Sequence, residues 1–165
     1  MRGSFTVSAL GAGVDRSTFL CGSEPLDRYF QTQVTQDIKR RVTACFVAGD
    51  ASGKVVGYYT LASASVSLSD LPAEVTKRLP RYPSVPAVRM GRLAVDLSVK
   101  GSGLGAALLS DALRRASVAE IAAYTLIVDA KDSAAASFYA HHGFIALPHQ
   151  EMTLFLPLAS VQKLL

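Results

Sequence analysis

The sequence has few of the residues that build metal centres or disulfide frameworks: two cysteines and three histidines among 165 residues. Cys21 and Cys45 stand far apart and outside any metal-ligand spacing, and two thiols make no disulfide framework. His141 and His142 are adjacent, so they cannot share one helix face as paired metal ligands do. We therefore expect no metal site. Cys45, inside an apolar run, is expected to be a small core residue.

Long apolar segments are missing as well. The longest stretch without charge, Val55–Ser69, is interrupted by serine, glycine and threonine, which excludes a membrane span. Met1–Ser4 carries one positive charge, but neither an apolar block nor a cleavage site follows, so no secretion signal is indicated. We expect a cytoplasmic chain with no membrane partner. Its length, its 50% hydrophobic residues and the lack of repeats or linkers predict a single domain over residues 1–165.

Positive charge is present in modest excess and is clustered. The net charge is +4 at pH 7. One cluster consists of Lys39, Arg40 and Arg41, and the second of Lys77, Arg78, Arg81, Arg89 and Arg92. A basic surface attracts polyanions, but solvated helix faces have the same composition. Composition alone leaves both interpretations open.

Hydrophobic periodicity predicts a mixed α/β fold. Ser23 and Pro25 are typical of a helix start. Apolar residues then recur near every fourth position and share one helix face: Leu26, Phe30, Val34 and Ile38. Residues 62–69 alternate between apolar side chains and serine, which predicts a strand with one buried and one solvated face.

The predicted elements alternate along the chain. The strands are expected at 5–10, 42–48, 55–68, 87–96, 124–128, 144–147 and 152–156. Beyond the first helix, helices are expected at 72–79, 103–117 and 133–141. The order βαββ(α)βαβαββ indicates a mixed sheet with helices packed on it.

The glycine-rich turn Lys100–Gly105 carries the clearest chemical signal. An apolar strand ends at Asp96, and the turn opens an apolar helix. Unpaired amides and the dipole at a helix start bind phosphate, and glycines let the backbone approach an anion closely. A plain tight turn is the alternative. A P-loop is excluded because Gly-Lys-Ser/Thr is missing, and a dinucleotide fold because its glycines follow the first strand.

The turn resembles motif A of the GNAT superfamily of N-acetyltransferases. Lys100 stands where the family more often has Gln or Arg. Downstream, Val128–Phe144 resembles motif B through the spacing of its Ala, Phe-Tyr and Gly-Phe residues, with Asp132 where Asn is common. The resemblance implies the GNAT fold, an α/β (α+β) fold with a mixed, mostly antiparallel sheet of six to seven strands. About four helices are expected to pack on both faces.

The same resemblance implies acetyl-CoA as the cofactor of an acyltransferase. The residues that it places against coenzyme A are Leu93, Ala94, Val95, Lys100, Gly101, Ser102, Gly103, Leu104, Gly105, Ala106, Asp132, Ala135 and Phe138.

A narrower resemblance is to the GNAT toxins of bacterial toxin–antitoxin pairs. It is carried by four segments: Leu26–Phe30, Gly91–Asp96, Phe138–Phe144 and Thr153–Leu156. It implies acetylation of the α-amino group of aminoacyl-tRNA, which blocks translation. It also implies a ribbon-helix-helix antitoxin as partner and a homodimer. The alternatives are a GNAT that acetylates a small amine or peptide N-terminus, and a non-catalytic acetyl-CoA-binding regulator.

Acetyl transfer needs a neutral amine and a proton for the departing thiolate. An α-amino group has a pKa of roughly 7.7–8.0, so a strong base is dispensable, and the strand before the glycine turn offers no glutamate. Tyr139 is the predicted general acid; a packing role beside Phe138 is the alternative. Arg92 is expected either to pair with Asp96 or another acid or to touch the tRNA 3′ end. The expected tRNA phosphate contacts are Lys39, Arg40, Arg41, Lys77, Arg78, Arg81 and Arg89.

Overall fold

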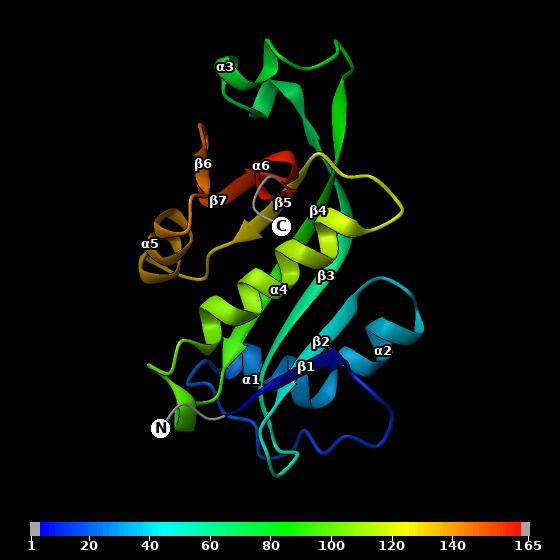
Figure 1. Cartoon of the computed structure of the whole chain (residues 1–165), viewed down its shortest axis with the longest axis vertical. Coiled ribbons are helices and arrows are strands. Elements are labelled where there is room, and N and C mark those ends of the chain that lie inside the picture. The colour runs from blue at the N-terminus through cyan, green and yellow to red at the C-terminus, as the bar shows by residue number, and fades with distance from the viewer. Residues whose placement is uncertain (1–3, 163–165) are drawn as a thin grey trace. The chain divides into compact units, whose positions relative to one another are not determined.

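The computed structural model describes residues 4–162, which form two compact units (Figure 1). The first unit takes the described chain up to Ala62 together with Gly91–Ala112. The second takes Ser63–Met90 and the chain from Leu113 onward. Three elements contribute residues to both units: β3 (Val55–Ser67), β4 (Ser84–Val95) and α4 (Leu104–Val118).

The strands of the first unit follow the order β1-β2-β3-β4. β1 (Thr6–Ala9) and β2 (Ala44–Gly49) are antiparallel, as are β2 and β3. The helices α1 (Glu24–Thr32) and α2 (Val34–Lys39) supply much of the core. At its centre the Phe30 ring stacks on the Tyr58 ring with centroids 4.3 Å apart. Phe19 meets both rings edge-on.

Helices cover both faces of the sheet in this unit. Tyr58 of β3 faces α1, where it stacks on Phe30. A Cβ added at the neighbouring Gly57 would lie 2.9 Å from a methyl of Leu108 in α4. Because successive residues of a strand point to opposite faces, α1 and α4 lie on opposite sides. The close approach of α4 also explains why position 57 is glycine.

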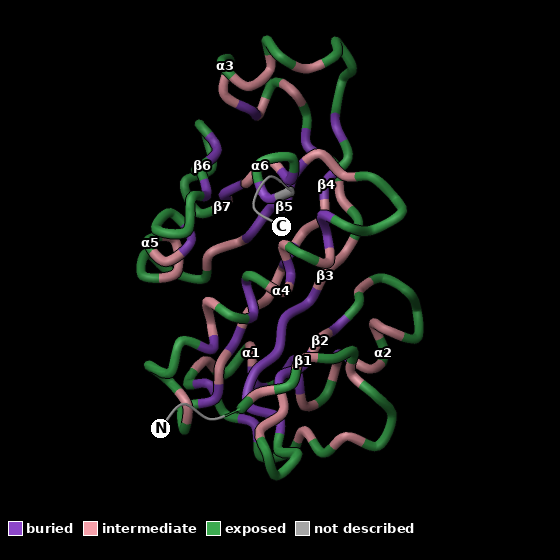
Figure 2. Tube along the Cα trace, in the orientation of Figure 1, coloured by how far each residue is buried: buried purple, intermediate pink, exposed green. Residues whose placement is uncertain are grey.

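The second unit follows the order β3-β4-β5-β7-β6. β4 pairs in parallel with β5 (Thr125–Asp129), while β5 with β7 (Gln150–Pro157) and β7 with β6 (Ile145–Leu147) are antiparallel. The apolar run of β5 is buried from Thr125 to Val128 (Figure 2). Its helices are α3 (Ala73–Thr76), α5 (Ser133–His141) and α6 (Leu158–Gln162). The predicted mixed, mostly antiparallel α/β fold with seven strands is therefore confirmed.

The observed elements differ from the predicted ones in three places. The first predicted helix is interrupted at Gln33, where a turn residue separates α1 from α2, although the apolar face continues and Val34 is fully buried. The predicted helix at 72–79 is only the four-residue α3, which precedes the proline-rich stretch 80–86. The helix α6 was not predicted. No helix within residues 4–162 combines the length and apolar character that a membrane crossing requires.

Candidate active site

The glycine turn of the first unit is open on its outer surface. β4 leads into a short 3₁₀ helix, η2 (Leu97–Val99), and the chain then passes through Lys100–Gly103 into α4. Gly101 and Gly103 have φ of +80° and +87°, a region that side chains disfavour. A Cβ added at either position would meet nothing within 4 Å. Among the described residues, no atom therefore lies directly against these two glycines on the side where a side chain would stand.

The start of α4 offers free amides beside the turn. Its first turn closes with the bond from the Ala107 amide to the Gly103 carbonyl, at 3.1 Å. The amides of Leu104, Gly105 and Ala106 precede that bond and have no acceptor within the helix. Together with the helix dipole, these donors favour an anion. The residues present thus fit the diphosphate of coenzyme A.

The side chain of Asp96 holds the backbone that leads into the glycine turn. Its buried carboxylate accepts hydrogen bonds from the Ser98 amide at 3.0 Å, the Ser98 hydroxyl at 2.8 Å and the Leu20 amide at 3.1 Å. Burial alone would raise the Asp96 pKa, but these hydrogen bonds outweigh it and lower the pKa. Asp96 was predicted only as a partner for Arg92. The Asp-Leu-Ser spacing, typical of an aspartate that bonds the backbone two residues on, was the signal for its true role.

β4 is the last strand of the first unit and leaves backbone groups free at its edge. Its register with β5 covers Ala87–Met90. Gly91–Val95 lies beyond that register, so alternate amides of this segment have no strand partner within the first unit. Such amides, around Leu93 and Val95, can donate to a carbonyl oxygen.

Tyr139 lies on α5 in the second unit with its ring packed and its hydroxyl free. The residue is 4% exposed and meets Phe138 and Phe144 at centroid distances of 5.4 and 5.7 Å. The hydroxyl makes no hydrogen bond within residues 4–162. Burial, and more weakly the charge of Asp129, raises the Tyr139 pKa. The phenol is therefore protonated at neutral pH and can act as an acid.

Three predicted cofactor contacts lie in α5 or directly before it: Asp132, Ala135 and Phe138. Asp132 is the N-cap of the helix, and its carboxylate accepts the Ala135 amide at 2.8 Å. This capping role explains an acid at the position, and it leaves only the second carboxylate oxygen for a ligand. Phe138 is half-buried and also meets His142 edge-on at 4.8 Å.

The predicted tRNA-binding residues fall into three different environments. Six are exposed, and they divide between the C-terminal end of α2 and the region of α3: Lys39, Arg40, Arg41, Lys77, Arg78 and Arg81. Lys77 and Arg78 line a cavity of about 470 Å³ together with Tyr124.

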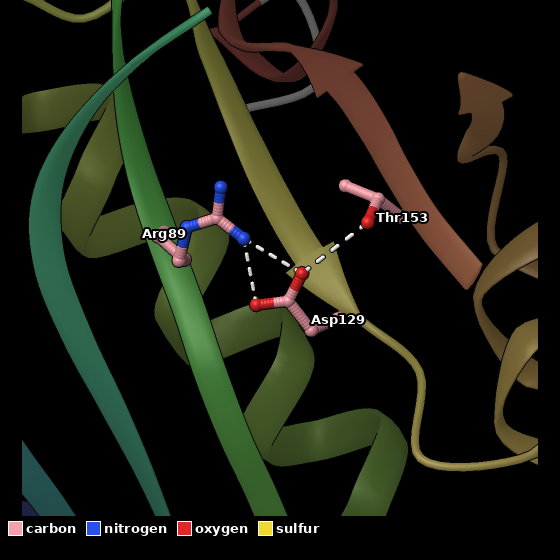
Figure 3. A network of polar contacts seen from close by, with 3 residues as sticks. All are labelled: Arg89, Asp129 and Thr153. Carbon is pink, nitrogen blue, oxygen red and sulfur yellow. Dashed lines mark hydrogen bonds and ion pairs between the residues drawn. The ribbon is translucent and has the colours of Figure 1, made fainter. Parts of the chain in front are cut away.

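The other two predicted tRNA-binding residues, Arg89 and Arg92, are only partly exposed. Arg89 donates to both oxygens of Asp129, at 2.6 and 2.7 Å, and Thr153 also contacts that carboxylate (Figure 3). The Arg92 guanidinium lies over the Tyr29 ring. The predicted pair of Arg92 with Asp96 does not form, because Asp96 is used by Ser98 and Leu20.

Comparisons with known proteins identify relatives over almost the whole chain. The family model described as an acetyltransferase (GNAT) domain matches residues 21–153. A protein of Sinorhizobium fredii named probable toxin TacT is 31% identical over 92% of this chain and 89% of its own. A protein of Mycobacterium tuberculosis named tRNA-acetylating toxin is 34% identical over 92% of this chain and 90% of its own.

Solved structures agree with this relationship. AtaT complexed with acetyl-methionyl-tRNAfMet has a TM-score of 0.90 and 30% identity, covering 98% of this chain and 99% of its own. An AtaT mutant toxin bound to the C-terminus of the antitoxin AtaR and acetyl-CoA has a TM-score of 0.82 and 28% identity, covering 98% of this chain and 97% of its own.

Proposed function

Because the chain belongs to the GNAT family of acetyltransferases, we propose that it is a toxin that acetylates the α-amino group of aminoacyl-tRNA. An acetylated amine cannot attack a peptidyl ester, so translation stops. The observation that carries the proposal is 34% identity, over 92% of this chain, to a protein named tRNA-acetylating toxin. Acetyl-CoA is the acetyl donor of this enzyme.

The diphosphate and the acetyl carbonyl of the donor are proposed to bind to the first unit. The open turn and the amides at the start of α4 bind the diphosphate, and free amides of Leu93–Val95 polarise the acetyl carbonyl. The proposed contacts of coenzyme A are Leu93, Ala94, Val95, Lys100, Gly101, Ser102, Gly103, Leu104, Gly105, Ala106, Asp132, Ala135 and Phe138. Acetyl-CoA itself supplies the activated thioester.

The transfer is proposed to use Tyr139 as the acid and no strong base. The neutral amine nitrogen bonds to the carbonyl carbon, the carbon–sulfur bond breaks, and the surplus amine proton passes to solvent. Tyr139 gives its proton to the departing sulfur, which its raised pKa permits at neutral pH. An α-amine with a pKa near 7.7–8.0 is already partly neutral.

The contacts with the acceptor tRNA are proposed from charge, and the protein partners from sequence similarity to toxins. The exposed basic residues of α2 and of the α3 region, from Lys39 to Arg41 and from Lys77 to Arg81, contact tRNA phosphates. A ribbon-helix-helix antitoxin neutralises the toxin, and the enzyme acts in the cytoplasm as a homodimer. We further propose that residues 1–165 form one domain.

The decisive experiment incubates the protein with labelled acetyl-CoA and total charged tRNA, followed by nuclease mapping. Label on aminoacyl-adenosine is expected. Reversing charge in the double variant Arg78→Glu, Arg81→Glu should abolish labelling of tRNA and leave acetylation of a free amino acid ester unchanged. Label only on small amines would indicate the small-amine enzyme instead, and no transfer from cofactor-loaded protein would indicate a regulator.

A further inference from the structure

The guanidinium of Arg92 forms no ion pair within residues 4–162, although its charge and that of the Asp37 carboxylate attract each other. It projects from β4 over the ring of Tyr29 in α1, with its central carbon 3.4 Å from the ring centroid. No carboxylate lies within 4.0 Å of it, and it makes no hydrogen bond, within residues 4–162. Its five N–H donors are therefore unused by the described chain.

The aromatic platform under this guanidinium is held in place. The Tyr29 hydroxyl donates to Asp37 at 2.7 Å, and the Gln33 side chain donates to the other oxygen of the same carboxylate at 3.2 Å. Burial, followed by the bond to Asp37, raises the Tyr29 pKa, so the phenol keeps donating throughout the neutral range. A fixed ring fixes the plane of the guanidinium that stacks on it.

Three other arginines of the chain are satisfied by protein groups. Arg89 pairs with Asp129, Arg28 pairs with Glu24, and Arg16 donates to the Phe30 carbonyl at 2.5 Å. Arg92, only partly exposed, is the exception among these four. The Tyr29 ring and the Asp37 carboxylate balance its charge only in part, and its N–H groups have no acceptor within residues 4–162, so an anionic ligand would supply both. An arginine whose face is stacked keeps its edge free, and that edge matches the oxygens of a phosphate.

The position of Arg92 separates it from the cofactor diphosphate. Asp96, which follows the end of β4, is four positions further along the chain than Arg92, and this corresponds to about 13 Å of extended strand. Arg92 instead directly precedes Leu93, whose neighbouring amides are proposed to hold the reacting carbonyl. An anion on Arg92 would therefore belong to the acceptor that approaches this carbonyl.

We propose that Arg92, presented by Tyr29, binds the phosphodiester next to the terminal aminoacyl-adenosine of the acceptor and so selects nucleotide-linked amines over free ones. The inference rests on the proposed function. The amine to be acetylated and the first phosphate belong to the same nucleotide, so binding one positions the other.

The test compares two acceptors that differ only by a phosphate: an aminoacyl-adenosine with and without a 5′-phosphate. The wild type is expected to prefer the phosphorylated acceptor by about 10- to 100-fold in kcat/KM, the range of a charged hydrogen bond. Arg92→Gln should reduce this preference to about one, and Arg92→Lys should leave an intermediate preference. Arg28→Gln, an exposed arginine of α1, is the matched control and should keep the full preference.

Several outcomes would overturn the inference, and they separate it from the proposed function. If Arg92→Gln still prefers the phosphorylated acceptor, or if the wild type does not prefer it, Arg92 does not bind the phosphate. A weakened affinity of Arg92→Gln for coenzyme A assigns the residue to the donor instead. If the wild type acetylates charged tRNA in these cases, only the inference fails. If it acetylates neither charged tRNA nor the analogues, the proposed function fails and the inference with it.

Discussion

At the residue scale, Tyr139 has a buried ring, and its hydroxyl makes no hydrogen bond within residues 4–162. We predict that Tyr139→Phe lowers kcat by about 10²- to 10⁴-fold, because only the proton donor is lost. This corresponds to a loss of about 3–5 kcal/mol of transition-state stabilisation. The ring packing against Phe138 and Phe144 is kept, so affinity for coenzyme A and the melting temperature should not change. Steady-state kinetics and calorimetry measure these quantities. Tyr82→Phe, at a residue 64% exposed, is the control.

The pH profile distinguishes an acid from a merely structural tyrosine. The rate should rise with pH as the acceptor amine becomes neutral, at a pKa below the roughly 7.7–8.0 of an ordinary α-amino group because the acceptor is an ester. A raised pKa means that Tyr139 stays protonated to higher pH than an ordinary tyrosine, so no decline is expected up to about pH 10. A fall in rate near pH 8, or equal rates for Tyr139→Phe and the wild type, would contradict the acid role.

At the element scale, the connection from β4 to α4 depends on backbone conformation. Gly103 and Gly53 share a φ of +87°, and a Cβ added at either would meet nothing within 4 Å. Gly53 lies in the turn between β2 and β3 and is not among the proposed cofactor contacts. Alanine should therefore strain both positions alike, by about 1–2 kcal/mol of unfolding free energy.

The two glycine variants should differ only in cofactor binding. We predict that Gly103→Ala weakens coenzyme A affinity by at least about tenfold, because the added methyl and the strained backbone disturb the phosphate-binding amides. Gly53→Ala should leave that affinity unchanged. Calorimetric titration gives the affinities and thermal unfolding gives the stabilities. Equal affinities for the two variants would show that the diphosphate is bound elsewhere.

At the scale of the whole molecule, β3, β4 and α4 run through both compact units. A strand or helix cannot unfold in one half without losing its order in the other, so we predict one cooperative transition. Circular dichroism and tyrosine fluorescence should give the same midpoint. Acetyl-CoA at about 100 times its Kd should add roughly 2.7 kcal/mol to the unfolding free energy. Two separate transitions would contradict the single domain.

The sequence predicted a helix or strand well where its hydrophobic periodicity continued over many residues. All seven strands were expected near their observed positions, and the serines at 63, 65 and 67 are exposed as the alternation predicted. The open glycine turn at the head of α4 also follows from sequence, because glycine readily adopts the positive φ that Gly101 and Gly103 have there. The break at Gln33 was missed, since the apolar face continues across it.

Long-range partners were decided only by the tertiary structure. Arg92 and Tyr29 are 63 residues apart, as the numbering shows, and no local pattern indicates that one stacks on the other. The same holds for Arg89 and Asp129, which meet because β4 and β5 are neighbouring parallel strands. Sequence determines which conformations each segment can adopt, through backbone sterics and hydrophobic period. Which charges are paired and which are left for a ligand depends on strand order and packing, which bring distant residues together.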